Sequence, residues 1–171
     1  MMDYIFPNGN EVEFIDIASK LGYKQLCLIY GNYSLQLKEK IKKLQEKTKI
    51  KLLIGIKTKK QIKQQVDYIL TESSQKNQSF LEKPFFNVLY GCENTNFNHV
   101  LCKLAKKNDV NLAFSFSSFL TKKRMFTKNA KLNLRLAKKY GVDVIFGSFA
   151  SNPYQMRNYS DISSFFNLIL R

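Results

Sequence analysis

Leu26-Cys27-Leu28-Ile29-Tyr30 and Ile50-Lys51-Leu52-Leu53-Ile54-Gly55-Ile56 are the two stretches that decide the fold. In each of them apolar side chains follow one another with little interruption, which is typical of a β-strand that is buried on both faces. Between the two stretches, residues 34–48 carry Leu37, Ile41 and Leu44 at helical spacing, and Ser34 stands where a helix N-cap is expected. A helix between two doubly buried strands predicts a parallel strand–helix–strand unit.

The same alternation extends in both directions along the chain. Further strands are predicted at residues 4–6, 68–70, 86–90, 110–116 and 142–146, and further helices at 11–21, 59–65, 98–107, 121–140 and from about 161 to the end. Residues 71–84 predict a loop or a degenerate helix. About seven parallel strands with outer helices predict an α/β fold, a TIM-like barrel with residues 1–171 as a single domain. A complete barrel usually needs about 200 residues, so we expect a trimmed or incomplete one, with an open doubly wound sheet as the alternative.

Net charge is the most unusual property of the composition. The 171 residues contain 28 Lys and Arg against 13 Asp and Glu, a formal net charge of +15. Residues 96–171 hold 13 of these basic side chains and only 3 of the acidic ones. A lysine-rich composition bias is one explanation, but it would not remove acids from one half of the chain. We therefore predict a nucleic-acid partner that binds mainly to the second half.

Apolar content and cysteine spacing restrict the class of protein further. Hydrophobic residues make up 44% of the chain, and no apolar run approaches the roughly 20 residues that cross a bilayer. The N-terminal residues, with Asp3 and Pro7, lack the apolar segment of a signal peptide. Cys27, Cys92 and Cys102 form no C-x-x-C pair, so we expect buried thiols rather than disulfides or zinc ligands. Together these features predict a soluble cytoplasmic protein.

Five cations share one face of the predicted helix 121–140. They recur at intervals of three or four residues: Arg124, Lys128, Lys131, Arg135 and Lys138. No acidic residue between Asp109 and Asp143 offsets their mutual repulsion. A solvated helix face is the ordinary explanation, but acids are normally interspersed on such a face, so we favour a bound phosphate backbone. Phosphate contacts carry no information on base sequence.

His99 is the only histidine and stands at the start of the predicted helix 98–107. His99, Lys103 and Lys107 follow one another at intervals of four residues, so they share a face. A histidine in the first helical turn can donate to a phosphate that the helix N-terminus also attracts. The alternative is a histidine that packs or caps locally, and both explanations stay open.

Two loops near the C-terminus add candidate groups. The predicted strand 142–146 leads into Gly147-Ser148, whose backbone N–H groups are expected to be free at the mouth of the barrel. Ser160 or Asp161 is expected to cap the last helix. Arg157, in the loop before that helix, is expected to reach a phosphate or a partner protein.

The sequence lacks the motifs of autonomous catalysis. It has no G-x-G-x-x-G, no G-x-x-x-x-G-K-[ST] and no H-E-x-x-H pattern. A barrel hydrolase that holds two or three metal ions on histidines and carboxylates cannot be assembled with one histidine. We therefore predict no catalytic residues and no metal ligands in this chain.

Several segments of the second half occur together, and in the same order, in a known family. They are residues 98–105 (NHVLCKLA), 108–116 (NDVNLAFSF), 136–142 (LAKKYGV), 147–150 (GSFA) and 157–162 (RNYSDI). The first is similar to the pattern D-H-V-L-A-K-L, with Asn98 in place of the acid. Over roughly residues 85–166 the chain resembles the ribonuclease P protein component 3 family, the archaeal relatives of the thirty-kilodalton subunit of eukaryotic ribonuclease P and MRP.

The resemblance implies a trimmed TIM-type barrel and a noncatalytic subunit of ribonuclease P, the ribonucleoprotein that removes 5′ leaders from precursor tRNA by endonucleolytic cleavage. It implies that the RNA subunit performs the chemistry with Mg²⁺ and that the protein itself binds no cofactor. The implied partners are ribonuclease P RNA, protein component 2 in a heterodimer or heterotetramer, the other protein subunits and, indirectly, precursor tRNA. By position, the resemblance adds His99, Lys103, Lys107 and Arg157 to the predicted RNA-binding residues.

Two functions of other classes stay open at this point. A divergent metal-dependent barrel phosphoesterase, or a phosphate-binding enzyme, would act without RNA. A structural scaffold would make no contact with RNA at all.

Overall fold

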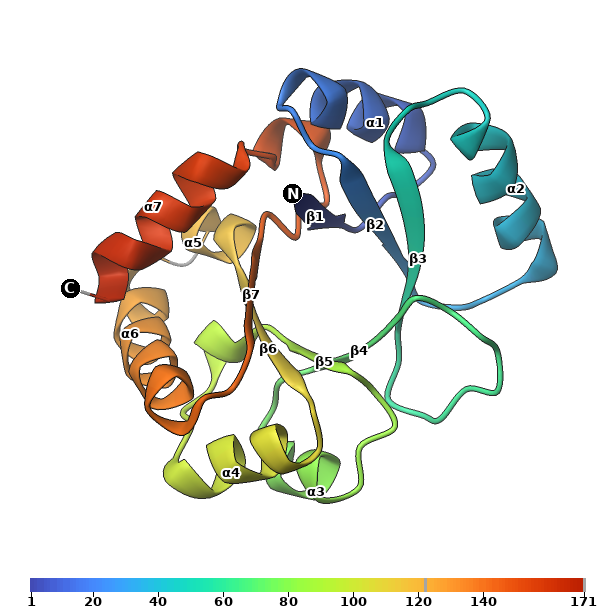
Figure 1. Cartoon of the computed structure of the whole chain (residues 1–171). Coiled ribbons are helices and arrows are strands. Elements are labelled where there is room, and N and C mark those ends of the chain that lie inside the picture. The colour runs from blue at the N-terminus through green and yellow to red at the C-terminus, as the bar shows by residue number, and fades with distance from the viewer. Residues whose placement is uncertain (122, 171) are drawn as a thin grey trace.

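In the computed structural model, seven parallel strands form a ring that is surrounded by helices (Figure 1). The structure describes residues 1–121 and 123–170, with the side chains of residues 1–120 and 128–170. The strands are β1 (Met2–Ile5), β2 (Gln25–Tyr30), β3 (Lys51–Lys57), β4 (Tyr68–Glu72), β5 (Val88–Tyr90), β6 (Asn111–Ser115) and β7 (Val144–Gly147). Each strand pairs with the next one along the chain, which confirms the TIM-like barrel and excludes the doubly wound sheet.

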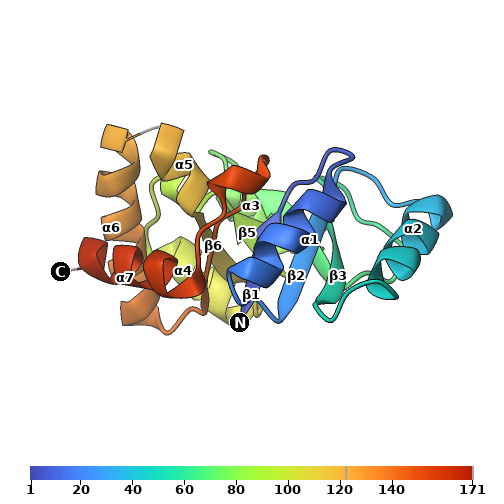
Figure 2. The ribbon, with the colours of Figure 1, turned by 90° about the horizontal axis from the view of Figure 1, so that it is seen from above.

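Helices cover most of the outside of the ring, as the view from above also shows (Figure 2). They are α1 (Glu11–Lys20), α2 (Leu35–Gln45), α3 (Asn77–Glu82), α4 (His99–Lys107), α5 (Phe116–Thr121), α6 (Lys123–Tyr140) and α7 (Tyr159–Leu170), with short 3₁₀ helices η1 (Cys92–Asn94) and η2 (Pro153–Gln155). The predicted N-cap of α2 is confirmed, because the Ser34 hydroxyl accepts a hydrogen bond from the Leu37 N–H at 3.0 Å.

The helices differ from the predictions in three places. The segment 59–65 is a loop and not a helix, because Ile62 is its only aliphatic side chain and offers no apolar face to bury. The predicted helix 121–140 is present as α6, but a separate short helix that was not predicted, α5, precedes it from Phe116, where the Ser115 hydroxyl accepts from the Ser118 N–H. The last helix begins at Tyr159, and its cap is Asn158, whose side chain accepts from the Asp161 N–H at 2.8 Å.

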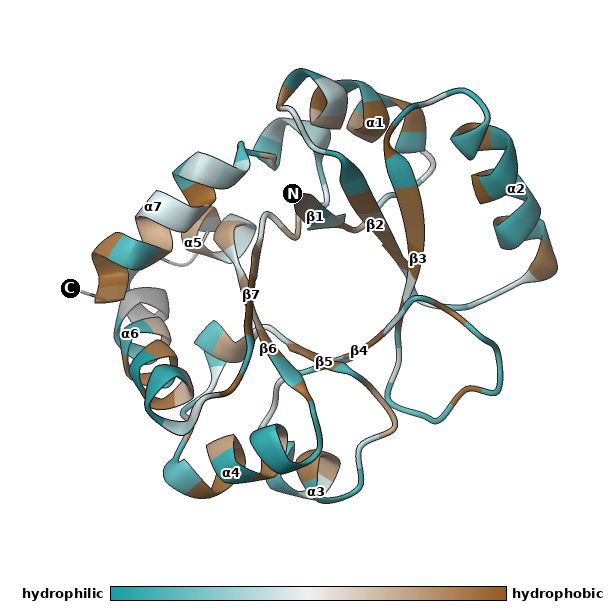
Figure 3. Ribbon diagram, viewed as in Figure 1, coloured by the Kyte–Doolittle hydropathy of each residue, from teal (hydrophilic) through white to brown (hydrophobic). Residues whose placement is uncertain are grey.

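The apolar runs form two layers because side chains alternate across each strand. In β2, Cys27 and Ile29 point into the barrel, while Leu26 and Leu28 pack against α1 and α2. The barrel interior is narrow at Gly55, where a Cβ would lie 3.0 Å from the Cys27 Sγ. Figure 3 shows the resulting pattern, with largely hydrophobic strands and helices that alternate between hydrophobic and hydrophilic residues.

A left-handed residue ends three of the helices where the chain turns into the next strand. Gly22, Gly141 and Asp109 occupy the same place in this turn, with φ angles of 78°, 64° and 54°. Glycine adopts this conformation without a steric penalty, and aspartate is one of the few other residues that tolerate it. This repeated turn leads the chain from the end of each of these helices into the next strand of the barrel.

The barrel closes between β1 and the chain just after β7 through one buried carboxylate. Asp3 is fully buried and accepts hydrogen bonds from the Ser148 N–H at 2.7 Å, from the Ser148 hydroxyl and from the Tyr4 N–H. Beyond it, the Phe6 N–H donates to the Ala150 carbonyl at 2.8 Å. The prediction that the Ser148 N–H is free at the mouth is therefore wrong, because the Asp3 side chain binds it where an eighth strand would stand.

This carboxylate predicts an unusual dependence of stability on pH. Burial raises the pKa of Asp3 to about 6, although the three donors partly oppose the shift. The folded state thus holds its proton more tightly than the unfolded state, so stability falls as the pH rises from about 4 to above 6, by up to about 3 kcal/mol. Urea unfolding of wild type and Asp3→Asn at pH 4 and pH 7 measures this change. We expect the variant to gain stability relative to wild type over that interval.

Asp16→Asn is the matched control, because it removes an exposed carboxylate of α1. Its stability relative to wild type should differ little between the two pH values. An Asp3→Asn variant that keeps the same difference from wild type at pH 4 and pH 7 would contradict the raised pKa.

Candidate nucleic-acid interface

The helix α4 presents the predicted row of basic residues to solvent. Asn98 caps its N-terminus by accepting from the Leu101 N–H at 3.0 Å. Leu101, Cys102 and Ala105 face the core and fix the orientation of the helix. His99, Lys103 and Lys107 are exposed as a result, as their spacing predicts.

In α6 the buried side chains likewise orient the cations that were predicted to share one face of this helix. Four side chains are buried on the inner face: Ala130, Asn133, Leu134 and Ala137. On the outer side Lys128, Arg135 and Lys138 are exposed, whereas Lys131 is half-buried. The side chain of Arg124 lies outside the described residues.

The two helices pack against each other on the outside of the barrel (Figures 1 and 2). We give the name α4–α6 face to the seven side chains of this pair that were predicted from the sequence and are exposed or half-buried: His99, Lys103, Lys107, Lys128, Lys131, Arg135 and Lys138. Within the part of the chain that the structure describes, none of these seven residues forms an ion pair with a carboxylate. The nearby Asp143 lies 3.7 Å from Lys106, which is not one of them. The basic side chains of this face are thus available to an external anion.

The structure does not bring Arg157 to the α4–α6 face. Arg157 follows η2, which packs against α1, and its backbone carbonyl accepts from the Tyr23 hydroxyl at 2.7 Å. Its guanidinium donates to the carbonyls of Tyr154 and Met156 at 2.9 and 2.7 Å. Arg157 therefore holds its own loop in place, and its exposed side chain lies on another part of the molecule.

The mouth of the barrel, where TIM-barrel enzymes act, is filled by this chain's own side chains. Phe149 is 2% exposed and stacks on Tyr4, with ring centroids 5.2 Å apart. Tyr90 packs on the same phenyl ring at 4.8 Å. Above them Lys57 pairs with Glu72 at 2.7 Å and lies over the rings of Phe6 and Tyr90. A phosphoesterase would need this space for its substrate.

The three thiols are poor nucleophiles. Cys27, Cys92 and Cys102 are free and buried, as predicted. Burial raises the pKa of Cys102 to about 11 and raises the pKa values of Cys27 and Cys92 further. Thiolates, the reactive form, are therefore scarce at neutral pH. Among the described residues, no group of three His, Cys, Asp or Glu side chains is placed to hold a metal ion.

Asn133 is a positioning residue that the sequence analysis missed. It is fully buried in α6, where its amide donates to the carbonyls of Cys92 and Thr95 at 2.7 and 2.6 Å and accepts from the Phe97 N–H at 2.9 Å. These bonds tie the loop between β5 and α4 to α6 and so set the spacing of the two basic helices. An asparagine on an otherwise apolar helix face was the available signal.

We expect Asn133→Ala to lower the free energy of unfolding by about 2–3 kcal/mol, because it removes the partner of two buried backbone groups and of one that is partly buried. Chemical denaturation followed by circular dichroism measures the loss. Asn129→Ala is the control, since Asn129 lies one turn earlier, is half-buried and has a side chain that makes no hydrogen bond with a described residue. Equal losses in the two variants would show that the bonds of Asn133 contribute nothing specific.

Fold and surface together define a class of protein: a TIM-like barrel with a filled mouth and an outer pair of helices whose basic side chains have no carboxylate partner in the described part of the chain. In sequence the chain is similar to ribonuclease P protein component 3 of Methanocaldococcus jannaschii, with 29% identity over 77% of this chain. This similarity confirms the resemblance to the ribonuclease P protein component 3 family. The chain spans 66% of that relative's length, slightly less than two thirds. No family model matches the chain.

The fold occurs in solved structures as well. A chain in the cryo-EM structure of archaeal ribonuclease P with mature tRNA matches all of this chain over 83% of its own length, with a TM-score of 0.85 and 24% sequence identity. A crystal structure of an uncharacterised protein matches 90% of this chain and 66% of its own length, with a TM-score of 0.53 and 9% identity. Both matches support the TIM-like barrel. None of the helices in the described residues is long and apolar enough to cross a membrane.

Proposed function

We propose that this chain is a noncatalytic protein subunit of ribonuclease P, which supports the RNA subunit in removing 5′ leaders from precursor tRNA. The observation that carries the proposal is the α4–α6 face, where six Lys and Arg side chains and His99 have no carboxylate partner among the described residues. The similarity to a ribonuclease P protein supplies the identity of the polyanion.

The protein acts by neutralising phosphates. Folding of an RNA catalytic domain brings phosphates together, and their repulsion is otherwise screened by Mg²⁺ and other counterions. A rigid surface of lysines and arginines takes over part of this screening without competing for the ions at the cleavage site. His99, in the first turn of α4, contributes to this surface, and the exposed cation Arg157 adds a contact on another part of the molecule. The subunit therefore lowers the Mg²⁺ concentration that the RNA needs, while the protein itself holds no cofactor.

The surface of the chain also offers a contact site for a protein partner. Leu132 on α6 and Leu168 on α7 are 47% and 67% exposed, which supports an apolar contact with another protein subunit. In our proposal that subunit is component 2, in a heterodimer or heterotetramer, and precursor tRNA is contacted indirectly through the assembled enzyme. The three buried free thiols support a reducing cytoplasm as the compartment.

Reconstitution tests the proposal directly. The ribonuclease P RNA and the other protein subunits of the same organism are assembled with and without this chain, and 5′-leader cleavage is measured across a Mg²⁺ series. Omission of the chain should shift the half-maximal rate to higher Mg²⁺. An unchanged Mg²⁺ curve, or hydrolysis of p-nitrophenyl phosphate by the isolated protein, would contradict the proposed role.

A further inference from the structure

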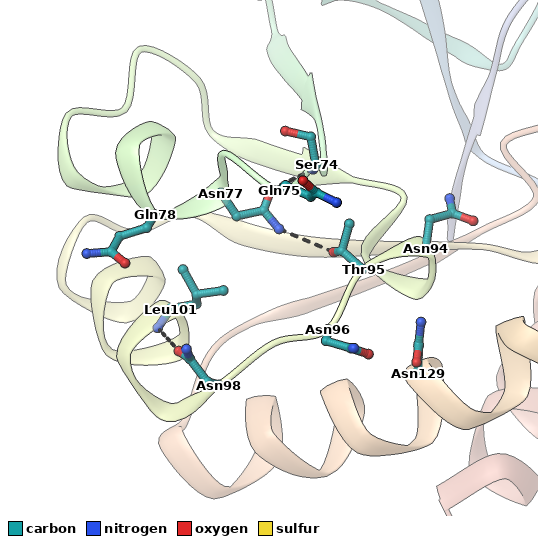
Figure 4. Close-up of a pocket in the computed structure, with 10 residues that line it drawn as sticks. All are labelled: Ser74, Gln75, Asn77, Gln78, Asn94, Thr95, Asn96, Asn98, Leu101 and Asn129. Atoms are coloured by element: carbon teal, nitrogen blue, oxygen red, sulfur yellow. Dashed lines mark hydrogen bonds between the residues drawn. The ribbon is translucent and has the colours of Figure 1, made fainter.

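A cleft of about 460 Å³ opens where the loops after β4 and β5 face α6 (Figure 4). Its described lining is almost entirely uncharged and polar: Ser74, Gln75, Asn77, Gln78, Asn94, Thr95, Asn96, Asn98, Leu101 and Asn129. Seven of these ten residues carry a carboxamide, and none carries a charge. The volume lies in the range of small-ligand sites.

Some of these carboxamides build the cleft and others are free to bind. Asn77 is buried and bonds to Ser73 and Thr95, and Asn98 caps α4. In contrast, the side chains of Gln75, Asn96 and Asn129 make no hydrogen bond with any described residue. In Figure 4 Asn129 extends from α6, Asn96 lies on the loop after β5 and Gln75 lies on the loop after β4. Free donors and acceptors therefore line the space from two sides.

The uncharged carboxamides of the lining indicate which kind of ligand fits the cleft. A carboxamide offers a donor and an acceptor side by side, which matches the paired groups on the edge of a nucleobase, adenine above all. An uncharged lining gives no advantage to a phosphate or a metal ion. The free carboxamides thus favour the neutral, hydrogen-bonding part of a nucleotide.

A second hollow shares a wall with the cleft and has a different character. Ser74 and Gln75 line both, and the second hollow adds Lys59, Lys76 and the half-buried ring of Phe80. Neither lysine pairs with a carboxylate among the described residues. Cations beside an aromatic ring suit the phosphate and sugar of an RNA strand, and the ring can stack on a base.

We propose that the carboxamide cleft binds one unpaired nucleobase of an RNA strand, with the adjoining phosphate held at Lys59 and Lys76. This inference rests on the proposed function, because it assigns a base-contacting site to a protein that otherwise contacts phosphates. A base bound here would fix the position of the RNA along the α4–α6 face, which phosphate contacts alone cannot do.

Fluorescence anisotropy with the full chain tests the site. The probes are fluorescein-labelled hexa-adenylate RNA and a hexamer of the same length and charge that carries abasic riboses. Wild type should bind hexa-adenylate about tenfold more tightly than the abasic hexamer, because one good carboxamide–base pair has an effect of about this size. Asn96→Ala and Gln75→Ala should lose most of this preference while the salt dependence of binding stays the same, since no charge is removed. Asn167→Ala, an exposed amide on α7, is the control and should behave as wild type.

The outcomes separate the site from the proposed function. Equal binding of both hexamers by wild type, with a steep dependence on salt, would overturn the nucleobase site and leave the phosphate contacts standing. Retention of the preference in both cleft variants would also overturn the site. Absence of salt-dependent binding to either hexamer would count against the proposed function itself.

Discussion

A variant that carries Lys103→Glu, Lys128→Glu and Arg135→Glu is expected to bind ribonuclease P RNA roughly a hundredfold more weakly than wild type. All three side chains are exposed on the α4–α6 face and lack a carboxylate partner among the described residues. Each reversal removes one phosphate contact and adds a repulsion in its place. None of the three packs in the core, so the circular dichroism spectrum and the unfolding midpoint should change little.

A charge-matched variant distinguishes this face from net charge. Lys38→Glu, Lys42→Glu and Lys43→Glu change the total charge by the same amount on α2, which lies on the far side of the barrel (Figure 1). We expect this variant to bind RNA within a few-fold of wild type. Equal losses in the two triple variants would mean that the RNA responds to total charge only. Undiminished binding in both would mean that residues outside the α4–α6 face hold the RNA.

Phe149→Ala is expected to lower the free energy of unfolding by about 3–5 kcal/mol, the usual cost of removing a buried phenyl ring. Phe149 fills the mouth of the barrel between Tyr4 and Tyr90, and it does so from a left-handed backbone conformation with φ at 46°. Alanine keeps this unfavourable conformation and loses the packing. Urea denaturation gives the loss, which is large for a domain of this size.

Two further variants calibrate that loss. Phe149→Leu keeps part of the volume and should be clearly more stable than Phe149→Ala. Tyr154→Ala, at a side chain that is 81% exposed, should change stability by less than about 0.5 kcal/mol. A loss below about 1 kcal/mol for Phe149→Ala would show that the mouth is not packed and could admit a ligand.

The sequence predicted well those elements whose structure follows from the residue pattern of a single segment. A run such as residues 26–30 is apolar at every position, so it can only be a strand with both faces covered, and the structure places it so. The exposure of His99, Lys103 and Lys107 follows from helical spacing once Leu101 and Ala105 are assigned to the core. The helix predicted at residues 59–65 is absent because these residues favour a helix locally but carry no apolar face that could pack a helix against the barrel.

The interactions between distant segments could not be predicted from one sequence. Asp3 and Ser148 are 145 positions apart, and neither shows alone that a carboxylate closes the barrel. Asn133 shows in the sequence only as an asparagine on an otherwise apolar helix face, and its three bonds to the loop after β5 exist only in the fold. The carboxamide cleft had one local signal, since Asn94, Asn96 and Asn98 alternate directly after a strand, but Gln75 and Asn129 join it only through the fold.

The central claim is that the α4–α6 face neutralises RNA phosphates, and the salt dependence of RNA binding tests it most directly. Dissociation constants of the wild-type protein for ribonuclease P RNA are measured at several salt concentrations between about 50 and 300 mM. Six neutralised phosphates predict that the logarithm of the binding constant falls against the logarithm of the salt concentration with a slope of about −4 to −5. A slope close to zero would contradict the account.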